Sequence, residues 1–329
     1  MLNRCAMLAL CLTLPLSLTL SVMAPSLQAQ PAYPSKPLRL VVPFPPGGPT
    51  DVLGRVVGQG LGQAFNQTVI VENKAGAAGN IGVDVIAKAA PDGLTLGVVP
   101  AGNIAVNPSL YPQLPYKAAD LAPVTLLATV DNVLVVNPDV SAKTLKELLA
   151  LAAAKPGALS YASPGAGSQA HLAGELLQTT AGVKLLHVPY KGTAPAMNDL
   201  LGGQVTMMFA QLSSALPQIR AGKLRALGLA SLTRSAAVPE IATLHEQGLT
   251  GFEAVSWYAL MVPAGTPTEV VDKLAVQTAL VLARPEVHDK LAAQGMTVAS
   301  GTPAQLAATI RSETQRWAEV IRRQNIQPD

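Results

Sequence analysis

The sequence has few cysteines, few aromatic residues and few charges for its length. Among 329 residues, cysteine occurs only as Cys5 and Cys11, aromatic residues make up 4% and charged residues 13%, whereas hydrophobic residues make up 49%. The chain after these two positions therefore has no disulfide, thiolate nucleophile or thiolate metal site. The core must be aliphatic, and this composition excludes a disordered chain and a coiled coil.

The charge balance is close to neutral. Lysine and arginine number 23 against 20 acidic residues, a net charge of +3. Arg4 is the only charged residue among the first 30, so the remainder carries 22 basic and 20 acidic residues, a net charge of +2. Binding to nucleic acid depends on many cations that neutralise phosphates. No nucleic-acid partner is expected.

The first 29 residues have the pattern of a secretory signal. Arg4 precedes an apolar stretch at 7–22, and Leu27-Gln28-Ala29 has the form of a cleavage site. The stretch is interrupted by polar residues and is shorter than the ~20 residues that a membrane anchor needs. We therefore expect residues 1–29 to be removed and the rest of the chain to work outside the cytoplasm.

Runs rich in valine, isoleucine and leucine alternate with helical patterns along the remaining chain. This alternation predicts an α/β fold with largely parallel sheets. Helices are expected between the strands, including one with an apolar stripe at 145–152, one begun by Pro267 and a last one at 303–321. The expected strands are 38–42, 68–72, 94–99, 132–136, 159–162, 184–187, 205–209, 225–229 and 254–262.

The length after the signal, about 300 residues, suits two domains of ~100–200 residues each. Two extended, helix-poor passages, 121–136 and 252–262, provide places where the chain can cross between domains. A chain that crosses twice has its second domain inserted in the first. The predicted boundaries are 1–29 for the signal peptide, 30–131 and 254–329 for domain 1, and 132–253 for domain 2.

A loop with two glycines follows the first expected strand. Residues 43–51 read PFPPGGPTD and lead into an amphipathic helix, so Gly47 and Gly48 leave N–H groups unpaired at a helix N-terminus. The helix dipole adds a positive potential there. This predicts an anion-binding loop, with an ordinary helix-capping turn as the alternative. Asp51 would repel an anion unless it accepts from the loop's own amides or meets an ammonium group of the ligand.

A second loop repeats this geometry at 163–168, which read SPGAGS between a short strand and a helix. Neither loop contains lysine or arginine, and two matching loops on two domains suggest one ligand held between them. The glycine spacing is not that of a dinucleotide fingerprint, and no Gly-Lys-Ser/Thr of a phosphate loop follows.

Two further loops, 76–82 and 189–195, are smaller candidates. The second joins a strand to a helix. Lys191 is the cation nearest to a candidate loop in the sequence. A lone lysine in a loop is usually a solvated surface charge, and that interpretation is favoured here.

Catalytic and metal-binding patterns are sparse. The only histidines are His171, His187, His245 and His288. His171 and Glu175 lie four residues apart on one helix face and could supply two metal ligands. No third partner is evident, so helix packing or capping is favoured for His171. The nucleophile elbow Gly-x-Ser-x-Gly is absent, and no catalytic residue, metal or cofactor is expected.

Short segments in a fixed order along most of the chain carry a resemblance to a known family. In this order and spacing the sequence resembles the Bug family, the extracytoplasmic solute receptors of tripartite tricarboxylate transporters. The segments include Pro45-Pro46-Gly47-Gly48 with Asp51, Val71-Glu72-Asn73-Lys74, Gly79-Asn80-Ile81-Gly82, Ser109-Leu110-Tyr111, Ser168 with His171-Leu172-Ala173, His187-Val188-Pro189-Tyr190-Lys191-Gly192, Trp257, and Pro263-Ala264-Gly265-Thr266-Pro267.

The resemblance implies a periplasmic-binding-protein fold, in which two α/β domains joined by two crossover strands close over a small organic carboxylate in the periplasm. It also implies that backbone amides of the two glycine loops hold the carboxylate. One departure from the family is Ala75 and Ala78, where proline and glycine are common. The predicted ligand-binding residues are Phe44, Gly47, Gly48, Asp51, Ser163, Gly165, Gly167, Ser168, Thr193 and Ala194.

Three functions stay open at this point. The favoured one is a monomeric receptor that binds without catalysis and delivers the carboxylate to membrane transporter subunits. A second is a periplasmic sensor whose closed form docks on a membrane signalling protein. The third, an exported enzyme acting on a carboxylate, is disfavoured by the missing nucleophile and metal ligands. Citrate-like, dicarboxylate, amino-acid, aromatic-acid and nicotinate-like ligands are all compatible with the sequence.

Overall fold

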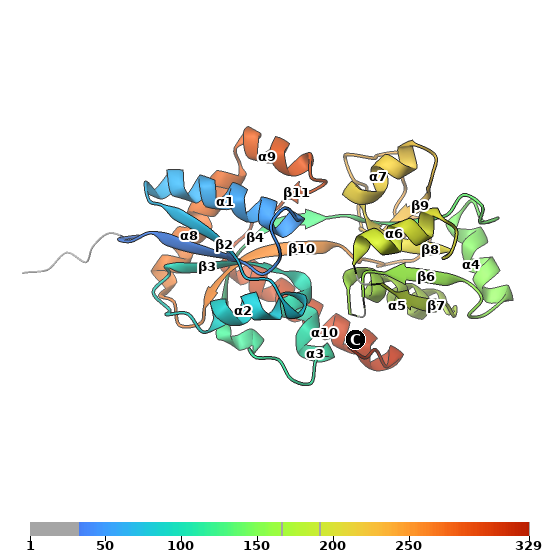
Figure 1. Ribbon diagram of the computed structural model, residues 1–329, viewed down its shortest axis with the longest axis horizontal. Coiled ribbons are helices and arrows are strands. Elements are labelled where there is room, and N and C mark those ends of the chain that lie inside the picture. Colours follow the sequence, from blue (N-terminus) through green and yellow to red (C-terminus); the bar gives the residue numbers. More distant parts are fainter. Residues whose placement is uncertain (1–32, 166, 191, 329) are drawn as a thin grey trace, which may run out of the picture. The chain divides into compact units, whose positions relative to one another are not determined.

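The computed structural model describes residues 33–165, 167–190 and 192–328, which contain two β-sheets (Figure 1). The predicted signal peptide lies outside these residues. The first sheet has the strand order β11-β4-β10-β3-β1-β2 and the second β7-β6-β8-β5-β9. The strands are β1 (Leu38–Val42), β2 (Val69–Asn73), β3 (Thr95–Pro100), β4 (Leu121–Val130), β5 (Asn132–Val136), β6 (Ser160–Ser163), β7 (Leu186–Pro189), β8 (Met207–Gln211), β9 (Arg225–Leu229), β10 (Ser256–Pro263) and β11 (Thr297–Val298).

Helices flank both sheets. Those in contact with the first sheet are α1 (Pro49–Phe65), α2 (Asn80–Ala87), α8 (Thr268–Leu282), α9 (Pro285–Ala292) and α10 (Pro303–Gln324). Those in contact with the second are α5 (Gln169–Ala181), α6 (Thr193–Leu201) and α7 (Leu212–Arg220), and α4 (Leu145–Ala154) shares its core. Shorter turns of helix are η1 (Ala77–Gly79), η2 (Gly102–Val106), α3 (Asn107–Leu110) and η3 (Ala118–Asp120).

The last helix, α10, contributes to the cores of both sheets. Leu306 near its start is buried with Val41 and Met261 of the first sheet. Trp317, about three turns later, is fully buried with Leu134 of the second sheet. One continuous helix therefore contacts both halves of the molecule, in addition to the strands that join them.

Glycines let helix α1 lie close to the first sheet. A Cβ atom at Gly54 would stand 2.6 Å from Cγ2 of Val42, and one at Gly58 would stand 3.1 Å from Cγ2 of Val71. Both valines are strand residues of β1 and β2. This close packing fixes the position of the helix, and with it the loop that precedes Pro49.

The chain passes between the two sheets twice. Strand β4 belongs to the first sheet and β5, which begins two residues later, to the second; the chain returns between β9 and β10. Contacts nonetheless group residues 33–329 as one compact unit. The domain boundaries at 131/132 and 253/254 therefore stay predictions.

All nine expected strands are confirmed, each within two residues of its predicted ends. The expectation of largely parallel sheets is wrong, because antiparallel pairings of β5 and β10 and of β4 with β11 outnumber the parallel ones among the described residues. An apolar run carries no information on strand direction. Strand β4 within the passage 121–136 and the short β11 were not predicted as strands. Pro267 caps helix α8 instead of starting it.

Within the described ranges, none of the helices combines the length and the apolar character that crossing a membrane would require.

The packing of α1 gives a first prediction. Gly54→Val should lower the free energy of unfolding by about 1–3 kcal/mol, because the added side chain overlaps Val42 in a filled core. Denaturant unfolding measures this change. Gln59→Val, at an exposed position of the same helix, is the matched control and should cost less than about 1 kcal/mol. Equal losses in the two variants would mean that α1 does not need this close approach.

Candidate functional site

A cavity of about 360 Å³ lies at the ends of strands from both sheets. It is bounded by the loop after β1, by the turn after β3, by the loop after β6 and by the start of β10. The residues around it are Phe44, Ala78, Pro100, Ala101, Gly102, Asn103, Asn107, Tyr111, Pro164, Gly165, Gly167, Ser168, Gln169, Ser256, Trp257 and Tyr258.

A second cavity, of about 450 Å³, adjoins the first and shares Phe44, Pro100 and Tyr258 with it. Its other lining residues are Pro45, Pro46, Gly48, Pro49, Thr50, Thr193 and Gln211. Of the residues that the structure describes, no aspartate, glutamate, lysine, arginine or histidine lines either cavity. An anion bound here would meet main-chain groups, amides and hydroxyls.

Tyr258 contributes to the wall between the two cavities. Burial raises the pKa of its phenol, and the side chains of Gln211 and Thr50 act against that shift. Gln211 ends β8 of the second sheet and Thr50 begins α1 on the first. The Tyr258 hydroxyl therefore remains a neutral hydrogen-bonding group at neutral pH.

The first glycine loop is held by Asp51. Its Oδ2 accepts from the Gly47 N–H at 2.9 Å and from Nε of Arg55 at 3.0 Å, and its Oδ1 accepts from Nδ2 of Asn73 at 2.9 Å. The same Nδ2 donates to the Phe44 carbonyl. Burial disfavours ionisation of Asp51, but these donors outweigh it and hold the pKa below its ordinary value. Asp51 thus accepts from its own loop, one of the two roles left open by the sequence.

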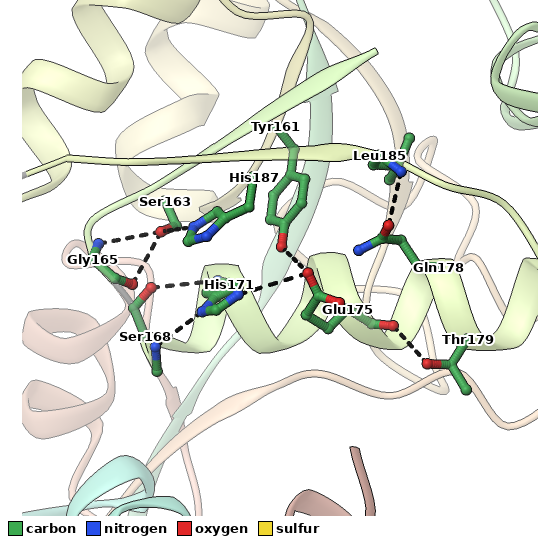
Figure 2. A network of polar contacts seen from close by, with 11 residues as sticks. Tyr161, Ser163, Gly165, Ser168, His171, Glu175, Gln178, Thr179, Leu185 and His187 are labelled. Atoms are coloured by element: carbon green, nitrogen blue, oxygen red, sulfur yellow. Dashed lines mark hydrogen bonds and ion pairs between the residues drawn. The ribbon is translucent and has the colours of Figure 1, made fainter. Parts of the chain in front are cut away.

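The second glycine loop is also held from within (Figure 2). Gly165 N–H donates to Oγ of Ser163 at 3.2 Å, and Gly167 N–H donates to Nδ1 of His171 at 3.0 Å. Ser168 caps helix α5, because its Oγ accepts from the His171 N–H at 3.3 Å. Ala166 lies outside the described residues.

These hydrogen bonds involve the same glycine N–H groups that the sequence analysis expected to hold the ligand. The N–H groups of Gly47, Gly165 and Gly167 already have acceptors in Asp51, Ser163 and His171, so in this conformation they do not face a ligand. The N–H groups at the starts of the helices that follow the two loops have no such acceptor among the described residues. In the described part of the chain, the main-chain N–H groups of Thr50 and Gln169, in the first turns of α1 and α5, donate no hydrogen bond.

Three helices start beside these cavities. Thr50 of α1 and Thr193 of α6 line one cavity, and Ser168 and Gln169 at the start of α5 line the other. Each helix N-terminus presents unpaired N–H groups and a positive dipole end. Together they provide the donors that an anion would need in the absence of a cation.

The predicted ligand-binding residues therefore separate into two groups. Phe44, Gly165, Gly167 and Ser168 line the first cavity, and Phe44, Gly48 and Thr193 line the second. Gly47, Asp51, Ser163 and Ala194 line neither. Asp51 and Ser163 are buried beneath their loops, at 3% and 0% exposure.

Lys191, the one cation considered as a ligand contact, lies outside the described residues. The metal interpretation of His171 and Glu175 has no support, because His171 Nδ1 accepts from Gly167 and Nε2 lies 3.7 Å from Oε1 of Glu175. No cluster of three or more potential metal ligands occurs in the described ranges.

A serine–histidine pair does occur. Ser163 Oγ lies 2.6 Å from Nε2 of His187, as in an activated nucleophile. The Ser163 side chain is fully buried, however, and also contacts both main-chain groups of Gly165. A substrate in either cavity does not reach it. The pair braces the loop and gives no support to the enzyme alternative.

Several lining residues were not predicted from the sequence. Asn103 and Asn107 are held by Asn80, whose Oδ1 accepts from Nδ2 of each and from the Tyr116 hydroxyl. Nothing in their spacing marks them, because η2 and α3 bring them to the cavity through this buried network. Ala78, where the sequence departs from the resembled family, has a left-handed φ of +52°.

Trp257 and Tyr111 also line the cavity. Both belong to the segments that carry the family resemblance, and that was the signal available for them. The indole Nε1 of Trp257 is buried without a hydrogen-bond acceptor among the described residues.

Comparison with known proteins decides the family. Residues 53–326 match the family described as "Tripartite tricarboxylate transporter family receptor". The chain is 42% identical to "Protein BugT" of Bordetella pertussis over 292 residues, which are 88% of this chain and 90% of that protein. The chain belongs to the family of tripartite tricarboxylate transporter receptors, the Bug family.

Solved structures of this family share the fold. Rpa4515 of R. palustris, with adipate, is 33% identical with a TM-score of 0.78, covering 90% of this chain and all of that one. MatC from Rhodopseudomonas palustris, with bound malate, is 32% identical with a TM-score of 0.72, covering 88% and 100%. The predicted fold class, a periplasmic-binding-protein fold of two α/β domains, is confirmed. The protein is a member of a family of solute-binding receptors.

The Asp51 contacts give a second prediction. Asp51→Ala should lower the free energy of unfolding by about 1–3 kcal/mol at pH 7, because it leaves the Gly47 N–H and the Asn73 amide without their acceptor. A carboxyl whose pKa is depressed by folding stabilises the protein above its unfolded pKa, and this contribution is lost as the pH falls through the folded value. The difference in the free energy of unfolding between the wild type and Asp51→Ala should therefore become smaller below about pH 4.

Denaturant titrations at pH 7 and pH 3 measure this difference. A variant as stable as the wild type at pH 7 would contradict the role of Asp51 as the internal acceptor of the first loop.

Proposed function

We propose that this receptor captures a small organic carboxylate in the two adjoining cavities and delivers it to the membrane subunits of a tripartite transporter. The observation that carries the proposal is the meeting of three helix N-termini, those of α1, α5 and α6, at cavities lined by uncharged groups. Family membership, and relatives whose structures hold adipate and malate, support the class of ligand.

The proposed donors are main-chain N–H groups. Thr50 and Gln169, with Thr193 and Ala194 at the start of α6, supply up to four. Hydrogen bonds to a charged group contribute roughly 1.5–3 kcal/mol each, and a micromolar affinity corresponds to about −8 kcal/mol. The sum is of the right size once the cost of ordering the ligand is subtracted.

A carboxylate that contacts both α1 and α5 binds the closed arrangement of the two sheets better than an open one. It therefore shifts the population toward the closed form. Membrane subunits that recognise this form would receive loaded receptor in preference to empty receptor. This route needs neither chemistry nor a cofactor.

The ligand is found by a thermal-shift screen of purified protein against carboxylates that include adipate, malate, citrate, glutamate, benzoate and nicotinate. A ligand that binds only the folded state raises the melting temperature. The proposal expects at least one carboxylate to do so, with the shift confirmed by calorimetry. Carboxylates that all leave the melting temperature unchanged, while cationic or neutral solutes raise it, would contradict the proposal.

The N–H mechanism gives a third prediction. Gln169 is the first residue of α5, a position that tolerates proline, and the extended Ser168 before it is compatible with one. Gln169→Pro removes one N–H while keeping the helix, and should weaken binding of the best carboxylate from the screen roughly 10- to 100-fold. Gln169→Ala keeps the N–H and is the control, with an expected change of less than about threefold. Equal affinities of the two variants would refute the role of this N–H.

A further inference from the structure

Five polar side chains lie beneath the second glycine loop and line neither cavity. We call Tyr161, Ser163, His171, Glu175 and His187 the histidine cluster (Figure 2). Four of them are at most 7% exposed. Polar groups buried at this density are expensive unless each is paired, and the proposed function gives them no contact with the ligand. Their arrangement points to a role in holding the loop.

His171 holds Gly167 directly. A ring nitrogen that accepts from an N–H carries a lone pair, so the 3.0 Å bond from Gly167 to Nδ1 requires the proton of the neutral ring to be on Nε2. Nε2 points toward Oε1 of Glu175, 3.7 Å away. The two ends of the imidazole are thus matched to one tautomer.

His187 holds Gly165 through a serine. Its Nε2 lies 2.6 Å from Oγ of Ser163, and this oxygen accepts from the Gly165 N–H and contacts the Gly165 carbonyl at 3.0 Å. The two imidazole rings stack on each other with centroids 3.8 Å apart and planes at 7°. Each glycine of the loop is therefore connected to one of two histidines that touch.

The charge in this cluster belongs to Glu175. Burial disfavours its ionisation, but the nearby Nε2 of His171, the hydrogen bond from Tyr161 and the proximity of both imidazoles hold its pKa below the ordinary value. Tyr161 donates to Oε1 at 2.5 Å and stacks on His187, and burial raises the pKa of its phenol far above neutrality. The titratable groups that face His171 are Glu175 on its own helix, Tyr161 on β6 and His187 on β7.

Protonation of Nδ1 has a defined consequence for the loop. The nitrogen changes from an acceptor to a donor, and its new N–H opposes the N–H of Gly167. Gly167 has a left-handed φ of +71° and a Cβ there would stand 2.0 Å from Cδ2 of Leu110, so this segment is closely packed. The bond that holds Gly167 is then lost, and with it the restraint that this bond places on Ser168 and Gln169.

Resting on the proposed function, we propose that His171 is a positioning residue for ligand capture. It holds the second loop in its binding geometry only while Nδ1 is unprotonated, so acid weakens the capture of a carboxylate. Glu175 and Tyr161 fix the tautomer of His171, and His187 and Ser163 hold the other glycine of the same loop.

His171→Asn is the informative variant. Oδ1 of asparagine is the same number of bonds from the backbone as Nδ1 of histidine, so it can accept from Gly167, but it does not titrate. His171→Ala removes the acceptor. His245→Asn is the matched control, because Nδ1 of His245 accepts from the Gly251 N–H at 2.9 Å in a turn that lines neither cavity.

The first experiment needs no ligand. The amide resonance of Gly167 and the ring nitrogens of His171 are followed by NMR between pH 8 and pH 5.5, a range in which imidazoles titrate. The Gly167 amide should shift together with the His171 ring in the wild type and stay constant in His171→Asn. A Gly167 amide that does not respond in the wild type, or that responds equally in His171→Asn, would overturn the proposal.

The second experiment measures affinity for adipate and malate by calorimetry over the same range. Wild-type affinity should fall about tenfold or more toward pH 5.5, as for loss of one charge-assisted contact. The affinity of His171→Asn should stay within about threefold of the wild type at pH 8 and should not fall toward pH 5.5. His171→Ala should bind weakly at every pH, and His245→Asn should have the same pH dependence as the wild type. Protonation of the acids themselves affects all four proteins alike.

The two experiments separate the two ideas. If neither acid binds at any pH and the carboxylate screen is also negative, the proposed function fails, while the Gly167 resonance still decides the role of His171. If the acids bind and the wild type and His171→Asn have the same pH dependence, the role of His171 fails and the proposed function stands.

Discussion

Holding a carboxylate without a cation depends on N–H groups that are fixed before the ligand arrives. In this protein the glycine loops are fixed by acceptors of their own: Asp51 for the first, Ser163 and His171 for the second. Each bond also removes a donor from the ligand. Among the described residues, the main-chain N–H groups of Thr50 and Gln169 at the starts of α1 and α5 make no such internal bond, and their positions follow from the internally bonded loops. Such preorganisation lowers the entropic cost of binding.

The same principle extends outward from the loops. Asn73 at the end of β2 joins Asp51 to the carbonyl of Phe44, and Asn80 orders the two asparagines that line the cavity. Glycines on α1 bring that helix close enough to the sheet to set the direction of its N-terminus. Among the described residues that hold the two loops, two buried carboxylates are charged, and both are compensated. Asp51 is paired with Arg55, and Glu175 is surrounded by its hydrogen-bond donor and two imidazoles. The cavities themselves remain uncharged among the described residues.

Much of the fold follows from the sequence, because apolar strands and amphipathic helices have distinct periodicities. The loops at 43–51 and 163–168 were predicted as a ligand site because glycine between a strand and a helix can leave N–H groups unpaired, and residues of both loops line the cavities. Strand direction was not predictable, since β5 and β10 run antiparallel to neighbours that are remote in sequence. The sequence also did not show which N–H groups of the loops bond to side chains of the protein itself. That Gly167 bonds to His171, and that Asn103 reaches the cavity, depends on side-chain geometry that no spacing in the sequence records.

The central claim, that main-chain N–H groups at helix ends hold an organic acid, is tested most directly by a crystal structure of the protein with its carboxylate. The account predicts carboxylate oxygens within 3.2 Å of the main-chain nitrogens of Thr50 and Gln169, as for any N–H···O hydrogen bond, with the Gly47 and Gly167 amides still bonded to Asp51 and His171. A carboxylate gripped by a lysine or arginine side chain, or bound away from both helix ends, would contradict it.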